Sequence, residues 1–381
     1  MAAVGGASAQ VSIYGTVDAA VTQYSQDGYT KTGLGNSQLG SSKIGFMGTE
    51  DLGGGMNAIF KLEGGLANDT GNGKASNTSN QAAGGAGQLT QVAGTQGLVF
   101  QRFSYVGLNG SFGEVRLGRD YTNTFLYAAG AFDPFGTNGP ADSTAMTFNL
   151  ALRGAPYTAT NISNMVGYTS PNMSGITARL QAFAGEGTNS TDGSGYSAQA
   201  QYSNGPLLIS AAQQVTTGTV KAAAAPSGSS AGTLATPGDY TQAAVGASYD
   251  FGMAKVMFTN VQEKLVTSPT VTGANNSNMI GVVVPMGALN YKASYIASIY
   301  NTGVTNAPDQ KGTLIGLGAD YTLSKRTKLY GTVSQVTNDG GTTAAGSQIY
   351  SAGNFASGKA AGTDGKTPTS TGVAIGINHT F

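Results

Sequence analysis

Few residue types in this sequence could carry out catalysis. The chain has no cysteine and a single histidine, His379, two positions before the last residue. A serine or cysteine nucleophile needs a base within hydrogen-bond reach, and a zinc site needs His or Cys ligands, so neither arrangement can be assembled. Carboxylate chemistry stays open, because Asp133, Asp142 and Glu114 could converge. The sequence therefore predicts a protein that is not an enzyme and that holds no metal and no cofactor.

The charged residues fit a second kind of chemistry, which acts on ions without a reaction. Carboxylates that face basic side chains across a water-filled passage set up a transverse field, and such a field acts on passing ions and dipoles. The basic candidates for one side of such a passage are Lys43, Lys61, Arg102 and Arg116. This arrangement needs a scaffold that turns all four side chains toward the same space.

A predicted β-hairpin near the N-terminus positions the two lysines. Residues 41–63 read SSKIGFMGTEDLGGGMNAIFKLE, with apolar residues at alternate positions on both sides of a glycine-rich turn. Such alternation is typical of two strands joined by a tight turn. Lys43, Lys61 and Glu63 share the opposite face, and strand parity turns Arg102 and Arg116 to that face as well. The apolar residues of the hairpin are Ile44, Phe46, Met56, Ala58, Phe60 and Leu62.

The composition does not suit a soluble globular domain. Charged residues make up 10% of the 381 residues, where about 25% is usual. Glycine, with 59 residues, is about twice as frequent as the usual ~7%. Lys plus Arg equals Asp plus Glu, so no net positive field recruits nucleic acid. No apolar run is long enough for a transmembrane helix, whereas the strands of a membrane β-barrel alternate and leave the mean hydropathy near neutral.

Strand-like alternation recurs along the chain and predicts about sixteen strands with no helix between them. Short turns alternate with long polar segments, which indicates that the two ends of the sheet face different environments. One strand face is apolar and the other carries Ser, Thr, Gln and Asn, as expected for a wall between lipid and water. Because backbone groups in lipid must pair within the protein, the sheet has to close. The expected long segments are Thr22–Leu39, Ala67–Val99, Asp120–Ser163, Thr217–Asp239 and Thr337–Thr371.

The N-terminal end of the chain carries a processing signal. The first nine residues, MAAVGGASA, end in an A-x-A pattern that is typical of a signal-peptidase site. We therefore expect residues 1–9 to be a residual signal peptide. Residues 10–381 are then expected to form a single barrel domain.

The chain resembles the general porins of the Gram-negative outer membrane, most closely their β-proteobacterial branch. The motifs that carry the resemblance run from the first strand to the last, and they include QVSIYGTVDA at Gln10, RFSYVGLNGSFGEVRLGRDY at Arg102, YTLSKRTKLYGTV at Tyr321 and GINHTF at Gly376. The resemblance implies an all-β fold, a sixteen-stranded antiparallel transmembrane β-barrel with short periplasmic turns and long extracellular loops. It also implies a homotrimer, in which the third loop, here residues 120–163, folds into the lumen.

The resemblance also implies where the pore is narrow. Family porins place a ladder of basic side chains on the barrel wall, opposite the infolded loop. By motif position, Lys43, Arg102 and Arg153 match this ladder. Lys61 and Arg116 join them by strand parity, so these five basic residues are expected at the pore constriction.

Three further positions can be compared with the family pattern. Asp133 lies in an Asp-Pro-Phe-Gly stretch that is similar to the family's Pro-Glu-Phe-Gly loop tip, although the acid here precedes the proline. Asp133 is therefore the expected acid of the constriction. At Gly167, where relatives often carry arginine, this chain has no charge. The terminal Phe381, preceded by alternating apolar residues, resembles the signal that the outer-membrane assembly machinery reads.

These features predict a passive diffusion channel for small hydrophilic solutes and ions in the outer membrane of a Gram-negative bacterium. Inward basic residues outnumber the acids at the constriction, so we expect a modest preference for anions. The expected partners are further copies of the chain in a homotrimer, membrane lipid and lipopolysaccharide, the assembly machinery and the solutes, with no nucleic acid. A plugged surface barrel, acting as an adhesin or a structural protein, is the alternative, and loop length does not separate the two.

Overall fold

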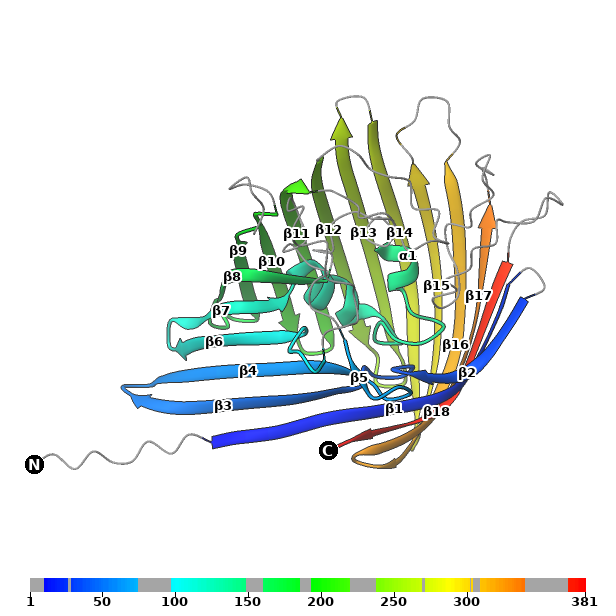
Figure 1. Ribbon diagram of the computed structural model, residues 1–381, viewed down its shortest axis with the longest axis horizontal. Helices are drawn as coiled ribbons and strands as arrows, with labels where there is room; N and C mark the ends of the chain where they lie inside the picture. The colour runs from blue at the N-terminus through cyan, green and yellow to red at the C-terminus, as the bar shows by residue number, and fades with distance from the viewer. Residues whose placement is uncertain are drawn as a thin grey trace, which may run out of the picture.

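One antiparallel sheet takes up most of the structure (Figure 1). The computed structural model describes residues 10–26, 29–74, 97–148, 160–185, 193–219, 238–268, 271–301, 303, 309–339 and 369–381. Residues 1–9, the expected signal peptide, lie outside these ranges. Within them, no helix has the length and apolar character needed to cross a membrane.

Eighteen strands are found in the described ranges, and each pairs antiparallel with its neighbours. The strands that precede the long internal connection are β1 (Gln10–Gln26), β2 (Tyr29–Asn36), β3 (Lys43–Gly53), β4 (Met56–Ala67), β5 (Asn72–Gly73), β6 (Phe103–Gly110) and β7 (Gly113–Tyr121). The strands that follow it are β8 (Asn161–Thr169), β9 (Ile176–Phe183), β10 (Gly195–Asn204), β11 (Leu207–Thr219), β12 (Gly238–Asp250), β13 (Lys255–Ser268), β14 (Val271–Met286), β15 (Leu289–Asn301), β16 (Gln310–Ser324), β17 (Thr327–Asp339) and β18 (Thr369–Thr380).

The sheet closes on itself at β1. One edge of β1 pairs with β18, so that Val17 lies opposite His379. The other edge pairs with β3 near the start of β1 and with β2 near its end, so β2 and β3 share one place in the wall. β5 adds only a two-residue ladder to β4. The wall is therefore a closed barrel of sixteen antiparallel strands, and the predicted fold class is confirmed.

One of the expected long segments is mostly strand. β1 continues to Gln26, and β2 returns beside it from Tyr29, so that Gln23 lies opposite Thr32. The prediction of a long loop over Thr22–Leu39 was therefore wrong. Polar residues occupy both faces of this outer hairpin, so no apolar alternation marked its strands in the sequence.

The C-terminal residue lies across the seam of the barrel. The N–H of Gly15 donates to the carbonyl oxygen of Phe381, and the N–H of Phe381 donates to the carbonyl oxygen of Gly15, both at 3.1 Å. A Cβ on residue 15 would stand 2.3 Å from the Phe381 ring. Only glycine at position 15 leaves room for the ring to cover the joined ends of the first and last strands.

The two faces of the barrel differ as the alternation predicted. Apolar side chains remain exposed on the outer face, where Ile375 is 66% and Leu180 is 55% exposed. Inward positions next to them in sequence hold small or polar residues, such as Ala374 and Gln181. Exposed apolar side chains around a sheet with fully paired strands suit a hydrocarbon environment. The apolar face of the N-terminal hairpin also points outward, because Phe46 lies opposite the exposed Ile13.

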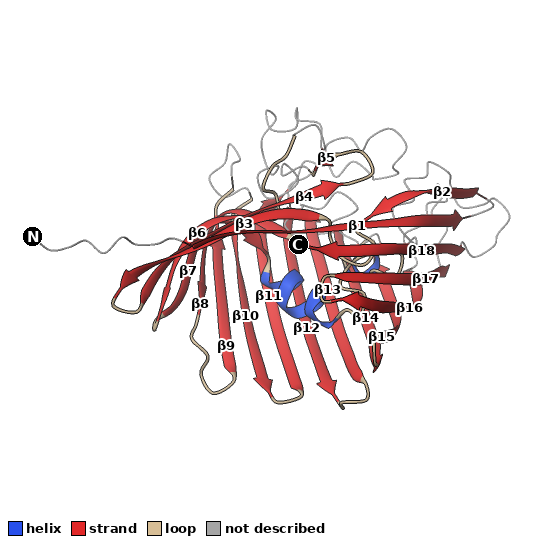
Figure 2. Ribbon diagram, turned by 90° about the horizontal axis from the view of Figure 1, so that it is seen from below, coloured by secondary structure: helices blue, strands red, loops and turns tan. Residues whose placement is uncertain are grey.

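The connection between β7 and β8 lies inside the barrel. Its described part, residues 122–148, contains a π-helical turn η3 (Thr124–Ala129), a 3₁₀ turn η4 (Gly130–Phe132) and a short helix α1 (Thr144–Thr147). Figure 2 shows these helical turns on the concave side of the sheet. η3 contacts β10 to β13, and α1 contacts β14 and β15. This loop therefore folds inward, as the family resemblance implied.

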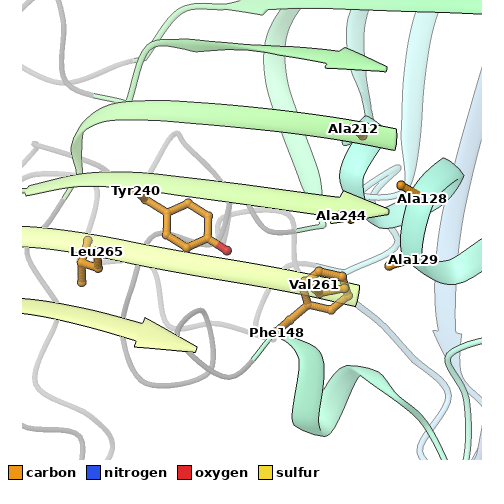
Figure 3. Close-up of a cluster of buried hydrophobic side chains, with 8 residues drawn as sticks. All are labelled: Ala128, Ala129, Phe148, Ala212, Tyr240, Ala244, Val261 and Leu265. Carbon is orange, nitrogen blue, oxygen red and sulfur yellow. The ribbon is translucent and has the colours of Figure 1, made fainter. Parts of the chain in front are cut away.

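The loop and the inner wall share an apolar core. Figure 3 shows one part of it, where Ala128, Ala129 and Phe148 of the loop pack with residues of β11, β12 and β13. In a second part, Met146 packs on a row of apolar wall residues that the strand register aligns. An inner wall that faced only water would be polar, so these apolar positions mark where the loop covers it. The wall residues are Ala212, Tyr240, Ala244, Val261 and Leu265 in the first part and Met279, Ile296, Leu314 and Val336 in the second.

Arginine substitutions on the two faces of β9 should separate lipid contact from lumen contact. Leu180→Arg places a charge on the outer face near the middle of the strand, and it should lower the free energy of unfolding by roughly 2–4 kcal/mol. Thr177→Arg on the inner face of the same strand serves as the matched control and should cost much less. Denaturant unfolding of both variants in lipid vesicles measures the difference, and equal losses would contradict this orientation of the wall.

Candidate functional site

A row of small residues on the inner wall forms a seat for the tip of the loop. The strand register places five of them side by side across β14 to β18, with glycine and serine in alternation. Because glycine has no side chain and serine has a short one, the wall is hollowed along this row. The row consists of Gly281, Ser294, Gly316, Ser334 and Gly372.

Bulky residues of the loop fill the space that these glycines leave. A Cβ on Gly281 would stand 2.3 Å from the Pro134 ring, and a Cβ on Gly372 would stand 2.6 Å from Pro140. The Ser334 hydroxyl also donates a hydrogen bond of 2.5 Å to the carbonyl oxygen of Pro140. The loop can therefore lie this close to the wall only because the wall carries glycine, which has no side chain, at these positions.

A buried aspartate on β1 fixes the segment on the other side of the loop tip. The Asp18 carboxylate accepts hydrogen bonds of 2.8–3.1 Å from three consecutive backbone N–H groups at residues 38–40. It also accepts one of 2.6 Å from the Tyr330 hydroxyl. The segment held in this way meets the loop, since the Ser41 hydroxyl donates to Asn138 Oδ1 at 3.1 Å. The loop tip thus spans from the seat to the junction between β2 and β3.

Asp133 lies at the loop tip, but its carboxylate is buried within the loop. It accepts the backbone N–H groups of Phe135, Thr137 and Ser143 at 2.8, 3.2 and 3.1 Å. Burial raises the pKa of Asp133. Desolvation, together with the nearby Asp133 carboxylate, raises the pKa of Asp142 to about 7. The loop therefore presents less negative charge near neutral pH than its sequence indicates, and Asp133 stabilises the fold of the tip.

Three basic side chains surround one carboxylate, that of Glu63 on β4. They come from β3, from β4 and from the residue that precedes β6. Glu63 is 1% exposed, and its Oε1 lies 2.5 Å from Arg102 Nε. Its Oε2 lies 3.7 Å from Lys43 Nζ and 3.9 Å from Lys61 Nζ, and it accepts a hydrogen bond of 2.8 Å from the Tyr14 hydroxyl. We call Lys43, Lys61, Glu63 and Arg102 the Glu63 cluster. One negative charge serves three positive charges, so the cluster carries a net positive charge.

Aromatic rings hold two of these cations in place. Lys61 Nζ lies 3.9 Å from the centroid of the Phe103 ring, and Arg102 Cζ lies 5.3 Å from that of Tyr121. A cation over a ring face is attracted by the ring quadrupole. The two charges are thereby kept at the wall and do not extend freely into the lumen.

Of the predicted basic residues, the structure brings Lys43, Lys61 and Arg102 together around Glu63. Arg116 lies nearby, over the ring of Tyr105, but pairs with other carboxylates. The Arg116 guanidinium pairs with Glu114 and lies 2.7 Å from Asp120 Oδ2. Two carboxylates therefore balance Arg116. Arg153, the remaining predicted member of the ladder, lies outside the described residues.

Two charged residues of the inner wall, Glu63 and Arg179, had no role predicted from the sequence. Glu63 was recognised on the same strand face as the two lysines, and this shared face was the available signal for its role. Arg179 on β9 lies with its Cζ 3.9 Å from the centroid of the Tyr127 ring in η3. No spacing in the sequence indicates this contact, since it depends on how the loop folds inward.

A second cluster of charges lies on the part of the wall built by β15, β16 and β17. The Asp320 carboxylate lies 3.0 Å from Lys292 Nζ and 3.1 Å from Lys328 Nζ. It also accepts a hydrogen bond of 3.0 Å from the Asn290 amide. Here again one carboxylate serves more than one cation.

The histidine belongs to neither cluster. His379 Nδ1 lies 2.9 Å from the Thr327 hydroxyl at an exposed position. In the part of the chain that the structure describes, no three His, Cys, Asp or Glu side chains are close enough together to hold a metal ion.

Comparison with known proteins agrees with this architecture. A family model for the Gram-negative porins matches residues 1–341. The chain is 33% identical to the outer membrane porin protein 32 of Delftia acidovorans, over all of this chain and 97% of the relative. It is 26% identical to the major outer membrane protein P.IB of Neisseria lactamica, over 98% of this chain and 95% of the relative.

Solved structures give the same result. An anion-selective porin from Comamonas acidovorans superimposes with a TM-score of 0.76 at 29% identity, covering 98% of this chain and all of the other. OmpT of Vibrio cholerae in its trimer form has a TM-score of 0.63 at 15% identity, with 98% of this chain and all of the other covered, and this match supports the fold alone. Family and fold point to a channel rather than an enzyme. The chain belongs to the Gram-negative porin family and is a passive channel of the outer membrane.

Proposed function

We propose that the Glu63 cluster lines the narrow part of the lumen and gives this channel a modest preference for anions. The observation that carries the proposal is the imbalance of charge in the cluster, where Lys43, Lys61 and Arg102 surround a single carboxylate. Small hydrophilic solutes and ions would pass between this cluster and the infolded loop, and they would move down their own gradients.

The acids of the loop do little to offset these cations. Asp133 is buried among backbone N–H groups of its own loop. The raised pKa of Asp142 leaves part of that carboxyl population neutral at pH 7. Fixed positive charge in a narrow passage concentrates anions and repels cations. The related solved porin that is described as anion-selective supports the same sign of selectivity.

We infer that the channel works as a homotrimer within outer-membrane lipid and lipopolysaccharide. Phe381 at the seam of the barrel would be part of the signal that the assembly machinery reads. Neither an enzymatic role nor a plugged adhesin is favoured by any observation on the described residues.

Removing opposite charges from the Glu63 cluster should shift the ion selectivity in opposite directions. The double variant Lys43→Ala, Arg102→Ala removes two cations, so its reversal potential across a salt gradient should move toward that of a cation-preferring pore. Glu63→Gln removes the one acid and should move it toward anions. Both shifts should weaken as salt rises, because the Debye length of about 8 Å at physiological ionic strength shortens.

Lys325→Ala is the control for this experiment, since Lys325 lies exposed in the short turn between β16 and β17. It should leave the reversal potential unchanged. If the cluster variants behave like this control, these side chains do not line the narrow part of the pore.

Filling the glycine seat should widen the passage. Gly281→Val places carbon atoms where the Pro134 ring lies, so the loop tip should leave the wall and the single-channel conductance should change, with larger neutral solutes admitted. Gly331→Val is the matched control, because a Cβ at position 331 meets no atom within 4 Å. Conductance and liposome swelling with sugars of increasing size measure the effect, and identical size limits for both variants would contradict the role of the seat.

Assembly can be tested by mass. Unheated protein in mild detergent should migrate near three times 38.2 kDa and should shift to the monomer position after boiling, because the association of folded barrels is lost on unfolding. A monomeric mass by light scattering before heating would contradict the proposed trimer.

A further inference from the structure

Four polar side chains are buried where the infolded loop covers β12, β13 and β14. The strand register places Gln242, Glu263 and Asn275 side by side on these strands, and Tyr240 lies two residues before Gln242 on the same face. All four are 2% exposed or less. Buried polar groups need hydrogen-bond partners, because burial without a partner is costly. We call these four residues the buried anchor.

The first helical turn of the loop, η3, is tied to one end of the buried anchor. The Thr124 hydroxyl in η3 donates to Gln242 Oε1. The Gln242 amide donates to the Tyr240 hydroxyl at 3.1 Å, and that hydroxyl donates to Glu263 Oε1 at 2.6 Å. A carboxylate only accepts hydrogen bonds, so this chain of donors ends at Glu263. Each donor in the chain is oriented by the acceptor that follows it.

The short helix α1 is tied to the same carboxylate from the other side. Asn275 Nδ2 donates to Glu263 Oε2 at 3.3 Å and to the carbonyl oxygen of Met146 in α1 at 3.0 Å. The Ser277 hydroxyl donates to the same carbonyl oxygen at 2.9 Å. Glu263 therefore orients the amide that holds α1 against the wall.

We infer that Glu263 is a positioning residue of this channel, which couples η3 and α1 so that the two segments stay on the wall or leave it together. Because the Glu263 carboxylate is buried, salt screens its hydrogen bonds much less than it screens the charges exposed to the lumen. The inference rests on the proposed function, in which the infolded loop forms one side of the narrow passage. Its test does not depend on ion flow.

A single thiol can report when α1 leaves the wall, since the chain has no cysteine of its own. Met146→Cys places this thiol where the native side chain is fully buried against the wall. The full-length protein in lipid vesicles is treated with a water-soluble thiol reagent, and the rate of labelling is measured. This rate follows the fraction of time for which the site is locally open.

Two further substitutions are each combined with Met146→Cys. Glu263→Gln keeps the volume but leaves one oxygen to accept from two donors, so the labelling rate should rise roughly 10- to 100-fold, as expected for a lost hydrogen bond to a buried charge. Thr124→Val removes the donor at the η3 end and should raise the rate roughly 2- to 10-fold. Thr124 lies in the other helical segment, so a purely local role of the buried anchor at α1 would not produce this second effect.

Thr259→Val, in the same Met146→Cys protein, is the matched control. Thr259 lies on the same face of β13 as Glu263 and is 2% exposed, and its hydroxyl has no hydrogen-bond partner among the described residues. This variant should leave the labelling rate unchanged. The unfolding temperature of the barrel is measured for every variant and should stay nearly constant, because only the loop is expected to open.

Three results would overturn the inference. The first is a labelling rate in Glu263→Gln that equals the rate in Thr259→Val, and the second is an unchanged rate in Thr124→Val. The third is a rise in labelling that is matched by a loss of barrel stability, because Glu263 would then support the whole wall and not the loop. Failure of the proposed function is distinguishable, since it appears in the reversal potentials of the Glu63 cluster variants and leaves the labelling rates unaffected.

Discussion

The closed pairing of backbone groups is the constraint on which the rest of this porin depends. In hydrocarbon an unpaired N–H or C=O has no water to bind, so a sheet can stand in the membrane only if its last strand returns to its first. Here β18 pairs with β1, and Gly15 and Phe381 exchange the last two hydrogen bonds of the seam. Once closure is satisfied, each residue is assigned to lipid or lumen by its position in the alternation alone.

The lumen side then divides into two kinds of wall. Where water reaches it, the wall carries charges such as those of the Glu63 cluster, held by rings and by a shared carboxylate. Where the infolded loop covers it, the wall carries apolar residues such as Met279 and Ile296, the row of glycine and serine, and polar residues such as Asn275, which donates to the loop backbone. The loop is thus packed against the barrel in the manner of a small domain core, and this packing holds it at one side of the passage.

Much of this could be predicted from the sequence, because strand alternation depends only on neighbouring residues. The N-terminal hairpin, the common face of Lys43, Lys61 and Glu63, and the closed barrel all follow from it. The parity argument for Arg102 was wrong, because Phe103 is buried on the inner face of β6 while Val106 and Leu108 are exposed on the outer face. Arg102 still reaches Glu63, because it precedes the strand and does not follow its alternation. The Asp133 carboxylate is buried by the turns of its own loop, and the stacking of Arg179 on Tyr127 depends on a contact between β9 and the infolded loop. Strand alternation encodes neither of them. The hairpin that the end of β1 forms with β2 was not predicted, because polar residues occupy both of its faces.

The glycine and serine seat has a consequence for the order of folding. Its residues lie on β14 to β18, whereas the loop that it receives lies near the first third of the chain. Asp18, which anchors the far side of the loop tip, bonds to Tyr330 and Asn378, 312 and 360 residues away. Contacts of such long separation form late, since the entropy of closing the intervening chain has to be overcome first. The loop has no complete seat until the final strands arrive, so the passage narrows in the same late step that seals the wall.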